Sequence, residues 1–493
     1  MRRAQWSAVA VAALGVGTIL AARWRARRIR VAGAPTRAFL AQGTRGSRGA
    51  RNVLVARTAS RIGRGYAFDS ARQIFASSAR RETLRDQRQL RTATEVAEAL
   101  GSMKGALMKL GQMASYLDAG MPSPVREALA TLQQDAPPMA SELAAMVVTD
   151  ELGSPPEELF ESWDPVPIAA ASIGQVHRAI TRDGVAVAVK VQYPGVDDAI
   201  RADLDNTATL LALAGLVFPG LDAKPLVEEL RARLIDELDY RLEADSQERF
   251  ATAFAGHPFI HIPSVRRDLS TGRVLTTELA AGARYDEVVA WSQEERDLAG
   301  ETIFRFVFGC LYRLNGFNGD PHPGNYLFHG GGRVTFLDFG LVKWFEPADV
   351  ALLAQMVDTI VIRRDPAAFR AAVEAAGFLK PAPSLSDDQV VNYLSHYYQM
   401  VLERGPSTCT PEYASETVRR FFDASDEVVR HANVPPAFVI LQRINLGLYA
   451  VLAGLRATAD WRRIAEEVWP WVNAPPSTDL GRSDAAWRTA REV

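Results

Sequence analysis

The sequence predicts an α+β protein in which a small strand-rich lobe precedes a larger helical lobe. Residues 166–192 alternate as two strands broken by a turn at Arg182, Asp183 and Gly184. From about residue 286 onward, nearly all of the chain has the pattern of helices. The chain has 493 residues, 48% of them hydrophobic and 23% charged, which is enough for a substantial core in one large or two to three ordinary domains.

The amino terminus carries an uncharged stretch of seventeen residues, 6–22, followed by a cluster of Arg. As a helix it would be about 26 Å long, slightly short of the roughly 30 Å hydrocarbon core. We interpret residues 1–30 as an uncleaved membrane anchor with a basic flank, because the Arg cluster opposes translocation of the residues after it. Five Arg follow the stretch and two precede it, so the remainder should face the cytoplasm. A cleaved signal peptide is the first alternative and a mitochondrial transit peptide is the second.

Charge is unevenly distributed along the chain. The first sixty residues hold twelve Arg and no Asp or Glu, although the formal net charge of the whole chain is only -2. We interpret residues 31–81 as a basic linker that lies near anionic headgroups or is simply soluble. The two cysteines, Cys310 and Cys409, provide neither a disulfide framework nor metal-site spacing, which fits a reducing compartment. No nucleic-acid partner is predicted.

The remaining segments are assigned from periodicity and from the position of proline. Residues 82–118 have apolar positions at helical spacing and few breakers, and two further helical stretches follow that are punctuated by prolines. Residues 82–154 are therefore expected to form a helical extension. Residues 155–285 contain the predicted strands and form the small lobe, and residues 286–474 form the helical lobe. Residues 475–493 are rich in Pro, Ser and charge, and are expected to be a flexible tail.

Two short motifs, GDPHPGN and LDFG, have the spacing of a protein-kinase catalytic loop and its metal-binding Asp. Asn325 follows Asp320 by five residues, and Asp338 follows it by eighteen. Phosphoryl transfer requires Mg²⁺ held against the phosphates and an acceptor oriented in line. The sequence therefore predicts an ATP site in a protein-kinase-like two-lobe fold, in which Asp320 orients the nucleophile while Asn325 and Asp338 hold Mg²⁺.

Lys190 lies on a predicted strand whose alternate valines would face the core, where an unpaired ammonium would be costly. Phosphate and a helix carboxylate are its natural partners, although a lysine on an amphipathic strand more often faces solvent. Glu243 is the preferred ion-pair partner, with Glu237 and Asp239 as alternatives on the same predicted helix. Glu278, at the end of a later predicted strand, is also assigned to the nucleotide site.

The segment before Lys190 is expected to cover the phosphates. It has Ala169, Ala170, Ala171 and Ser172 where ordinary kinases place several glycines. Alanine does not adopt positive φ cheaply, so the loop should be stiffer and nucleotide selectivity and turnover should differ from those of ordinary kinases. An alanine-rich hairpin without a ligand is the alternative.

Six motifs in order, MKLGQ, AAASIGQVH, VAVKVQYPG, ELDYRLEA, GDPHPGN and LDFG, closely resemble the UbiB family of atypical protein-kinase-like proteins. The resemblance covers about residue 82 to the mid 400s. It implies that the helical extension packs over the site where a peptide substrate would lie. It also implies that Lys109 pairs with Glu237 or Asp239 and reaches into the nucleotide pocket. Family members support isoprenoid quinone synthesis, bind ATP with Mg²⁺, show ATPase activity and associate with membranes.

Two departures from the family and from ordinary kinases affect the functional prediction. Asn318 stands where the family more often has His, and no Ala-Pro-Glu motif follows Asp338 to provide a platform for a protein substrate. We therefore expect a membrane-anchored, cytoplasm-facing atypical kinase or ATPase that binds MgATP and supports ubiquinone or other isoprenoid-lipid metabolism. Its partners would be the membrane and isoprenoid lipids or quinone-biosynthesis enzymes. The alternatives are a nucleotide-binding pseudokinase scaffold for a membrane complex and a true protein kinase.

Overall fold

The computed structural model describes residues 139–171, 173–198, 200–201, 232, 235–318, 321–380, 384–421, 426–433 and 436–492. All of them belong to one compact unit of the chain, Arg48–Val493. The predicted anchor, the basic linker and most of the helical extension, including Lys109, lie outside the described residues, as do Ser172 and Asp320. Within the described part of the chain, no helix has both the length and the apolar character needed to cross a membrane.

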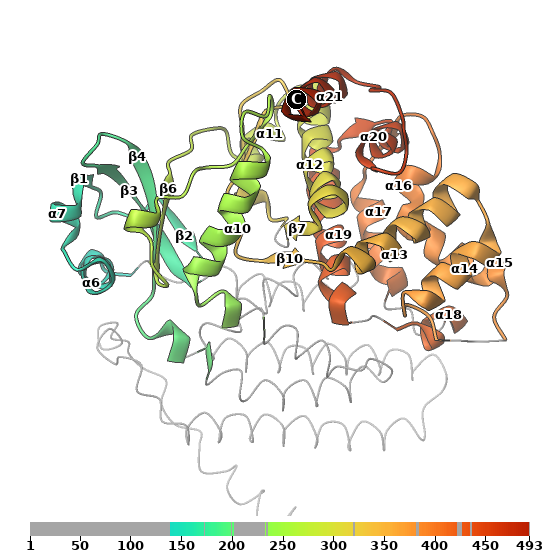
Figure 1. The fold of residues 1–493 in the computed structure, drawn as a ribbon, viewed down its shortest axis with the longest axis horizontal. Helices are drawn as coiled ribbons and strands as arrows, with labels where there is room; N and C mark the ends of the chain where they lie inside the picture. The colour runs from blue at the N-terminus through green and yellow to red at the C-terminus, as the bar shows by residue number, and fades with distance from the viewer. Residues whose placement is uncertain are drawn as a thin grey trace, which may run out of the picture. The chain divides into compact units, whose positions relative to one another are not determined.

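An antiparallel sheet of five strands forms the first lobe (Figure 1). Its strands are β1 (Phe160–Trp163), β2 (Ala169–Ala171), β3 (Gly174–Thr181), β4 (Ala186–Gln192) and β6 (Val274–Glu278). Their order is β1-β3-β4-β6, and β2 pairs with β3. Strands β3 and β4 form the predicted hairpin, and Gly184 in its turn has the left-handed backbone (φ 79°) that favours glycine.

Helices dominate the rest of the described chain. The longer ones are α6 (Ser141–Leu152), α10 (Tyr240–Ala253), α12 (Gln293–Leu314), α13 (Pro347–Val357), α14 (Pro366–Ala375), α15 (Asp387–Leu394), α17 (Pro411–Phe421), α19 (Pro436–Leu455), α20 (Trp461–Val468) and α21 (Asp479–Glu492). The shorter ones are α7 (Pro156–Leu159), α11 (Tyr285–Val288), α16 (Gln399–Leu402), α18 (Glu427–His431), the 3₁₀ helices η2 (Arg267–Leu269), η3 (Pro323–Asn325) and η5 (Ser395–Tyr398), and the π-helix η4 (Asp358–Arg363).

Short strands connect these helices. They are β5 (Ile260–His261), β7 (Gly316–Asn318), β8 (Tyr326–Phe328), β9 (Val334–Phe336), β10 (Val342–Trp344), β11 (Ser407–Thr408) and β12 (Thr458–Ala459). Strands β5, β9 and β8 form a small sheet in that order, β7 pairs with β10, and β11 pairs with β12. The described part of GDPHPGN, residues 321–325, lies between β7 and β8, and LDFG lies between β9 and β10.

The two faces of the five-stranded sheet differ in chemistry because side chains alternate along a strand. Val187, Val189 and Val191 of β4 are fully buried and join residues of α6 in one apolar cluster. The intervening Lys190 points to the opposite face and meets α10. Figure 1 shows α10 between β6 and α12, so this helix connects the sheet to the helical lobe.

Helix α12 is the central element of the helical lobe. Ser292 caps its N-terminus by accepting a hydrogen bond from the Glu295 backbone at 3.3 Å, and Asn315 ends it with a left-handed backbone (φ 53°). Phe304 and Phe306 are among the α12 residues in the largest apolar cluster of the described chain. Because β7 follows α12 directly, this helix determines where the chain that leads to the GDPHPGN motif begins.

The C-terminal residues differ from the flexible tail predicted for 475–493. Residues 479–492 form α21, whose Leu480 is buried. Asp484 of this helix makes ion pairs with Arg305 and Arg488. The segment lacks apolar periodicity, so its order arises from tertiary ion pairs and aromatic contacts that local sequence does not reveal.

Candidate functional site

Lys190 and Glu243 form an ion pair between the sheet and α10. The Nζ atom of Lys190 lies 2.7 and 2.8 Å from the two carboxylate oxygens of Glu243, and only 16% and 7% of the two side chains are exposed. Asp239 caps α10 by accepting a hydrogen bond from the Arg241 backbone at 3.1 Å, which places Glu243 in the first turn. The predicted pairing of Lys190 with Glu243 is confirmed.

The ionisation of this pair reflects burial and the surrounding charges. Burial lowers the pKa of Lys190, but the carboxylates of Glu243 and Asp338 outweigh it and hold the pKa well above its ordinary value. Burial raises the pKa of Glu243 to about 7, against the opposing effect of the Lys190 ammonium. Lys190 therefore keeps a full positive charge at neutral pH, as a phosphate-binding lysine requires.

Asp338 is a second carboxylate close to Lys190. Its Oδ2 atom is 3.8 Å from Lys190 Nζ, and its Oδ1 atom accepts a hydrogen bond from the Gly340 backbone at 2.9 Å. The backbone N–H of Leu337 donates to the carbonyl of Asn325 at 3.0 Å. The structure thus brings together the predicted lysine, the helix glutamate and both predicted metal-binding segments.

Asn318 contributes to the position of Asp338. Its Nδ2 atom donates to the backbone carbonyl of Asp338 at 2.9 Å. Strand β7, which contains Asn318, pairs with β10 just after the LDFG motif. This amide therefore ties the end of β7 to the segment that contains Asp338.

The donor set around Asp338 suits Mg²⁺. An Asp carboxylate and an Asn amide oxygen are the hard oxygen ligands that this ion prefers, and 30% of the Asp338 side chain is exposed. Among the described residues there is no group of three or more His, Cys, Asp and Glu that could hold a metal by itself. A Mg²⁺ ion bound at Asp338 would also take oxygens from phosphate and water, as this ion usually does.

The alanine-rich segment is a strand, not a loop. Ala169, Ala170 and Ala171 form β2 and pair with β3, and Val176 of β3 pairs in turn with Lys190. No alanine of β2 has positive φ, so the predicted conformational cost does not arise. Gly174 is the sterically required glycine here, because a Cβ on it would lie within 3.0 Å of the Val191 carbonyl and the Tyr240 hydroxyl.

Three further carboxylates predicted for the nucleotide site make contacts that the structure describes. Asp239 serves as the N-cap of α10. Glu237 is buried, and its charge contributes to the raised pKa of Glu243. Glu278 faces His261 at 3.1 Å and accepts from the Ser264 backbone at 3.3 Å, in a partly exposed position.

Aromatic residues that the sequence analysis did not select surround the LDFG motif. The ring of Phe250 on α10 lies 5.2 Å from the rings of both Phe339 and Trp344. The guanidinium of Arg249 lies 3.5 Å from the centre of the Trp344 ring. These contacts join the helix that carries Glu243 to the residues on either side of Gly340, and no local pattern in the sequence indicates them.

Residues 131–372 match the ABC1 atypical kinase-like domain. This chain belongs to that family, the UbiB family of atypical kinases. The match includes the five-stranded sheet, α10, α12 and both site motifs, and it ends within α14. Helices α19, α20 and α21 lie beyond it.

Individual ABC1 relatives occur in animals and bacteria. The chain is 35% identical over 255 residues to "Atypical kinase COQ8B, mitochondrial" of Rattus norvegicus, covering 51% of this chain and 48% of that protein. It is 31% identical over 311 residues to "Uncharacterized protein Rv0647c" of Mycobacterium tuberculosis, covering 61% and 64%. The chain therefore spans about half to two thirds of the length of these curated relatives.

A solved structure supports the same fold. The complex of Rv3197 with erythromycin from Mycobacterium tuberculosis superimposes with a TM-score of 0.58 at 31% identity, covering 78% of this chain and 97% of that one. The predicted kinase-like α+β fold is thus confirmed for the described residues. The hydrophobic segment that was part of the prediction lies outside them.

Proposed function

We propose that this ABC1 protein binds MgATP and either hydrolyses it or transfers its γ-phosphoryl group to a small or lipid-associated acceptor. The observation that carries this proposal is the proximity of Lys190 to two carboxylates, Glu243 at 2.7 Å and Asp338 at 3.8 Å. A kinase site is competent only when the strand lysine, the helix glutamate and the metal-binding aspartate are in place together.

Each residue has a distinct role in this proposal. Lys190 contacts the α and β phosphates, and Glu243 holds the lysine in position. Asp338 and Asn325 hold Mg²⁺, which when bound neutralises negative charge on the phosphates. Asp320 orients the nucleophile, and Lys109 reaches the nucleotide from the helical extension, as the family resemblance implies.

The short connection after the LDFG motif favours a small acceptor or water over a protein substrate. Residues 342–344 form β10, and α13 begins at Pro347. Protein kinases use a longer segment at this point to present a protein substrate. The chain has little space for such a segment between Gly340 and Pro347.

The membrane role in this proposal comes from the amino terminus and from the family. The uncharged stretch at 6–22, with its Arg flank, would anchor the chain with the ABC1 domain facing the cytoplasm. The relatives from Rattus norvegicus and Caenorhabditis elegans are named as mitochondrial. Their names do not give the orientation of this chain, so the cytoplasmic orientation proposed here rests on the Arg asymmetry around residues 6–22. An isoprenoid lipid, such as a ubiquinone precursor, is the acceptor or client that fits this location.

Phosphate release and MgATP binding by the full chain test the proposal. Asp338→Asn should abolish most phosphate release, because the metal site loses its carboxylate. Asp388→Asn, an exposed carboxylate on α15, should behave like the wild type. Equal and negligible phosphate release by the wild type and Asp338→Asn, with MgATP still bound, would instead support a pseudokinase scaffold.

A further inference from the structure

The C-terminal helix α21 contacts the end of α10 that lies away from Lys190. Arg491 donates hydrogen bonds from its guanidinium to the carbonyls of Ala255, at 3.1 Å, and Thr252, at 3.2 Å. The indole N–H of Trp487 donates to the same Ala255 carbonyl at 3.3 Å. About 13 Å of helix separates Thr252 from Glu243.

These contacts act as an external cap for α10. The last carbonyls of a helix have no intrahelical partner and favour a nearby cation, and α10 has no basic residue in its own last turn. Arg491 supplies that charge from α21. The Trp487 ring stacks parallel to Phe254, with centres 6.2 Å apart and planes 2° apart, and it meets the His257 ring edge-on at 4.4 Å.

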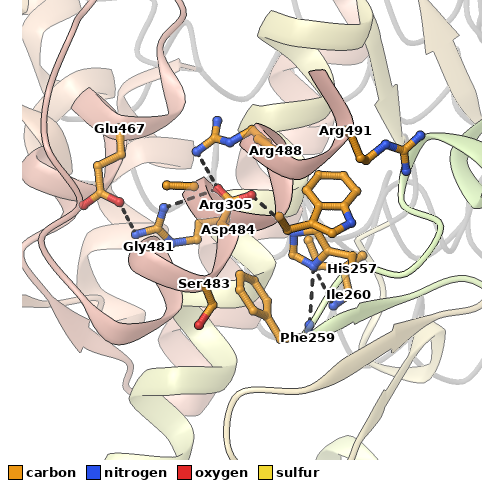
Figure 2. Close-up of polar contacts among 12 residues, drawn as sticks. His257, Phe259, Ile260, Arg305, Glu467, Gly481, Ser483, Asp484, Arg488 and Arg491 are labelled. Carbon is orange, nitrogen blue, oxygen red and sulfur yellow. Dashed lines mark hydrogen bonds and ion pairs between the residues drawn. The ribbon is translucent and has the colours of Figure 1, made fainter. Parts of the chain in front are cut away.

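A buried ion cluster fixes α21 to α12 (Figure 2). Only 2% of the Arg305 side chain is exposed, and its guanidinium lies 2.7 Å from both Glu301 and Glu467. It also lies 3.9 Å from Asp484 of α21, which pairs with Arg488 at 2.7 Å. Helix α21 is therefore held by charges inside the helical lobe and not only by its contact with α10.

His257 connects this ion cluster to the chain that leaves α10. Its Nδ1 atom accepts hydrogen bonds from the Phe259 and Ile260 backbones, at 3.4 and 3.1 Å. Its Nε2 atom therefore carries the hydrogen that it donates to Asp484 at 3.3 Å. Figure 2 shows His257 between Asp484 and these two backbone groups. Both α10 and the segment that follows it thus depend on α21.

We propose that α21 is a positioning element for the nucleotide site. By capping and anchoring the C-terminal end of α10, it holds Glu243 against Lys190 and so sets the affinity for MgATP. Trp487 and Arg491 are the positioning residues. The inference rests on the proposed MgATP function, and α21 lies beyond the matched ABC1 domain, which ends at residue 372.

Thermodynamic linkage makes this coupling reciprocal: if a docked α21 favours MgATP binding, bound MgATP must favour the docked α21. Bound MgATP also raises global stability, so a helix that contributed only to folding would gain no more protection than the rest of the helical lobe. Amide hydrogen exchange in residues 479–492 of the wild-type chain should therefore slow by more than exchange in the rest of that lobe when MgATP is added.

The test compares MgATP dissociation constants of full-length variants. Trp487→Ala and Arg491→Ala should each weaken binding roughly 5-fold or more. Trp487→Phe keeps the ring stack on Phe254 but loses the N–H donor, so its effect should be intermediate. Arg482→Ala is the matched control, because Arg482 is an exposed residue of α21 that pairs with Asp479 of the same helix; its affinity should equal that of the wild type.

The outcomes separate the two proposals. If the wild type binds MgATP, and folded Arg491→Ala and Trp487→Ala bind it equally well, with no MgATP-dependent protection of 479–492 beyond that of the rest of the helical lobe, the positioning role is overturned while the proposed function stands. If the wild type itself binds no MgATP, the proposed function fails and this inference fails with it. Arg491 is exposed at the surface, so its truncation tests the idea without removing core packing.

Discussion

Gly447 of α19 packs directly against Pro321, the residue after Asp320. A Cβ at position 447 would lie within 3.0 Å of the Pro321 ring. Both residues are buried, so neither has free space into which to move. The absence of a side chain at position 447 therefore allows α19 to pack against the predicted catalytic loop at Pro321.

Gly447→Ala should lower phosphate release by about 10- to 100-fold, because small displacements of reacting groups are costly in turnover. Helix propensity alone would make Gly447→Ala stabilising, since Ala is favoured over Gly in a helix interior by about 1 kcal/mol. A loss of phosphate release would therefore come from the contact with Pro321 and not from a weaker helix. Gly309→Ala in α12 is the matched control, because a Cβ there would meet nothing within 4 Å. Equal phosphate release by the two variants would show that the Gly447 contact does not position the loop.

The Lys190–Glu243 pair should be energetically coupled. Glu243→Gln removes the carboxylate closest to the buried ammonium, and Lys190→Met leaves a buried carboxylate, so each change should lower the free energy of unfolding by up to about 3–5 kcal/mol. The double variant removes both charges, so its loss of unfolding free energy should be smaller than the sum of the losses in the two single variants. The difference, which is the coupling energy of the pair, should be about 0.5–3 kcal/mol. Urea denaturation of the four proteins measures this, and strictly additive changes would contradict the observed pair.

His177 should make stability depend on pH. Burial lowers its pKa, against a hydrogen bond to the Asp164 carbonyl through Nδ1. The Met139 backbone donates to Gln175 Oε1 at 2.8 Å, so the Gln175 amide nitrogen faces His177 Nε2 at 2.9 Å and requires it to accept. The neutral ring satisfies all of these partners, whereas a protonated ring would place its Nε2–H against the N–H donor of the Gln175 amide.

The sign of the pH dependence is set by linkage. The folded-state pKa lies below the unfolded value of about 6.5, so the unfolded chain binds the proton first. This contribution to stability is fully present above about pH 6.5 and is lost as the pH falls through the folded pKa, at up to about 1.4 kcal/mol per pH unit. The gap in unfolding free energy between the wild type and His177→Gln should narrow between about pH 7 and about pH 5. A constant gap over that range would rule out His177 as the source.

Asn318 should be replaceable by His but not by Ala. Its side chain donates to the Asp338 carbonyl at 2.9 Å, and an imidazole N–H can make the same type of bond. Asn318→Ala should lower the free energy of unfolding by about 1 kcal/mol and reduce phosphate release, whereas Asn318→His should retain most of both. Comparable phosphate release by the Ala and His variants would mean that this bond does not orient Asp338.

Several features of the fold and site were predictable because they depend on local pattern. Strict alternation along β4 separated the three buried valines from Lys190, and a strand period of two residues makes that separation unavoidable. The spacing of Asn325 and Asp338 indicated metal-binding residues, and the structure ties their two segments together. The choice among Glu237, Asp239 and Glu243 required the structure, because only the actual start of α10 determines which carboxylate faces the sheet.

The sequence by itself determined the strand alternation, the kinase-like order of lobes and the identity of the charged residues, since these reside in short-range periodicity and motif spacing. Tertiary structure alone decided that Gly447 supports Pro321 and that α21 caps α10. Both relationships join residues far apart in the chain and depend on whether two surfaces approach within van der Waals or hydrogen-bond distance. Packing of that kind leaves no local periodic signal, so it emerges only when the chain has folded.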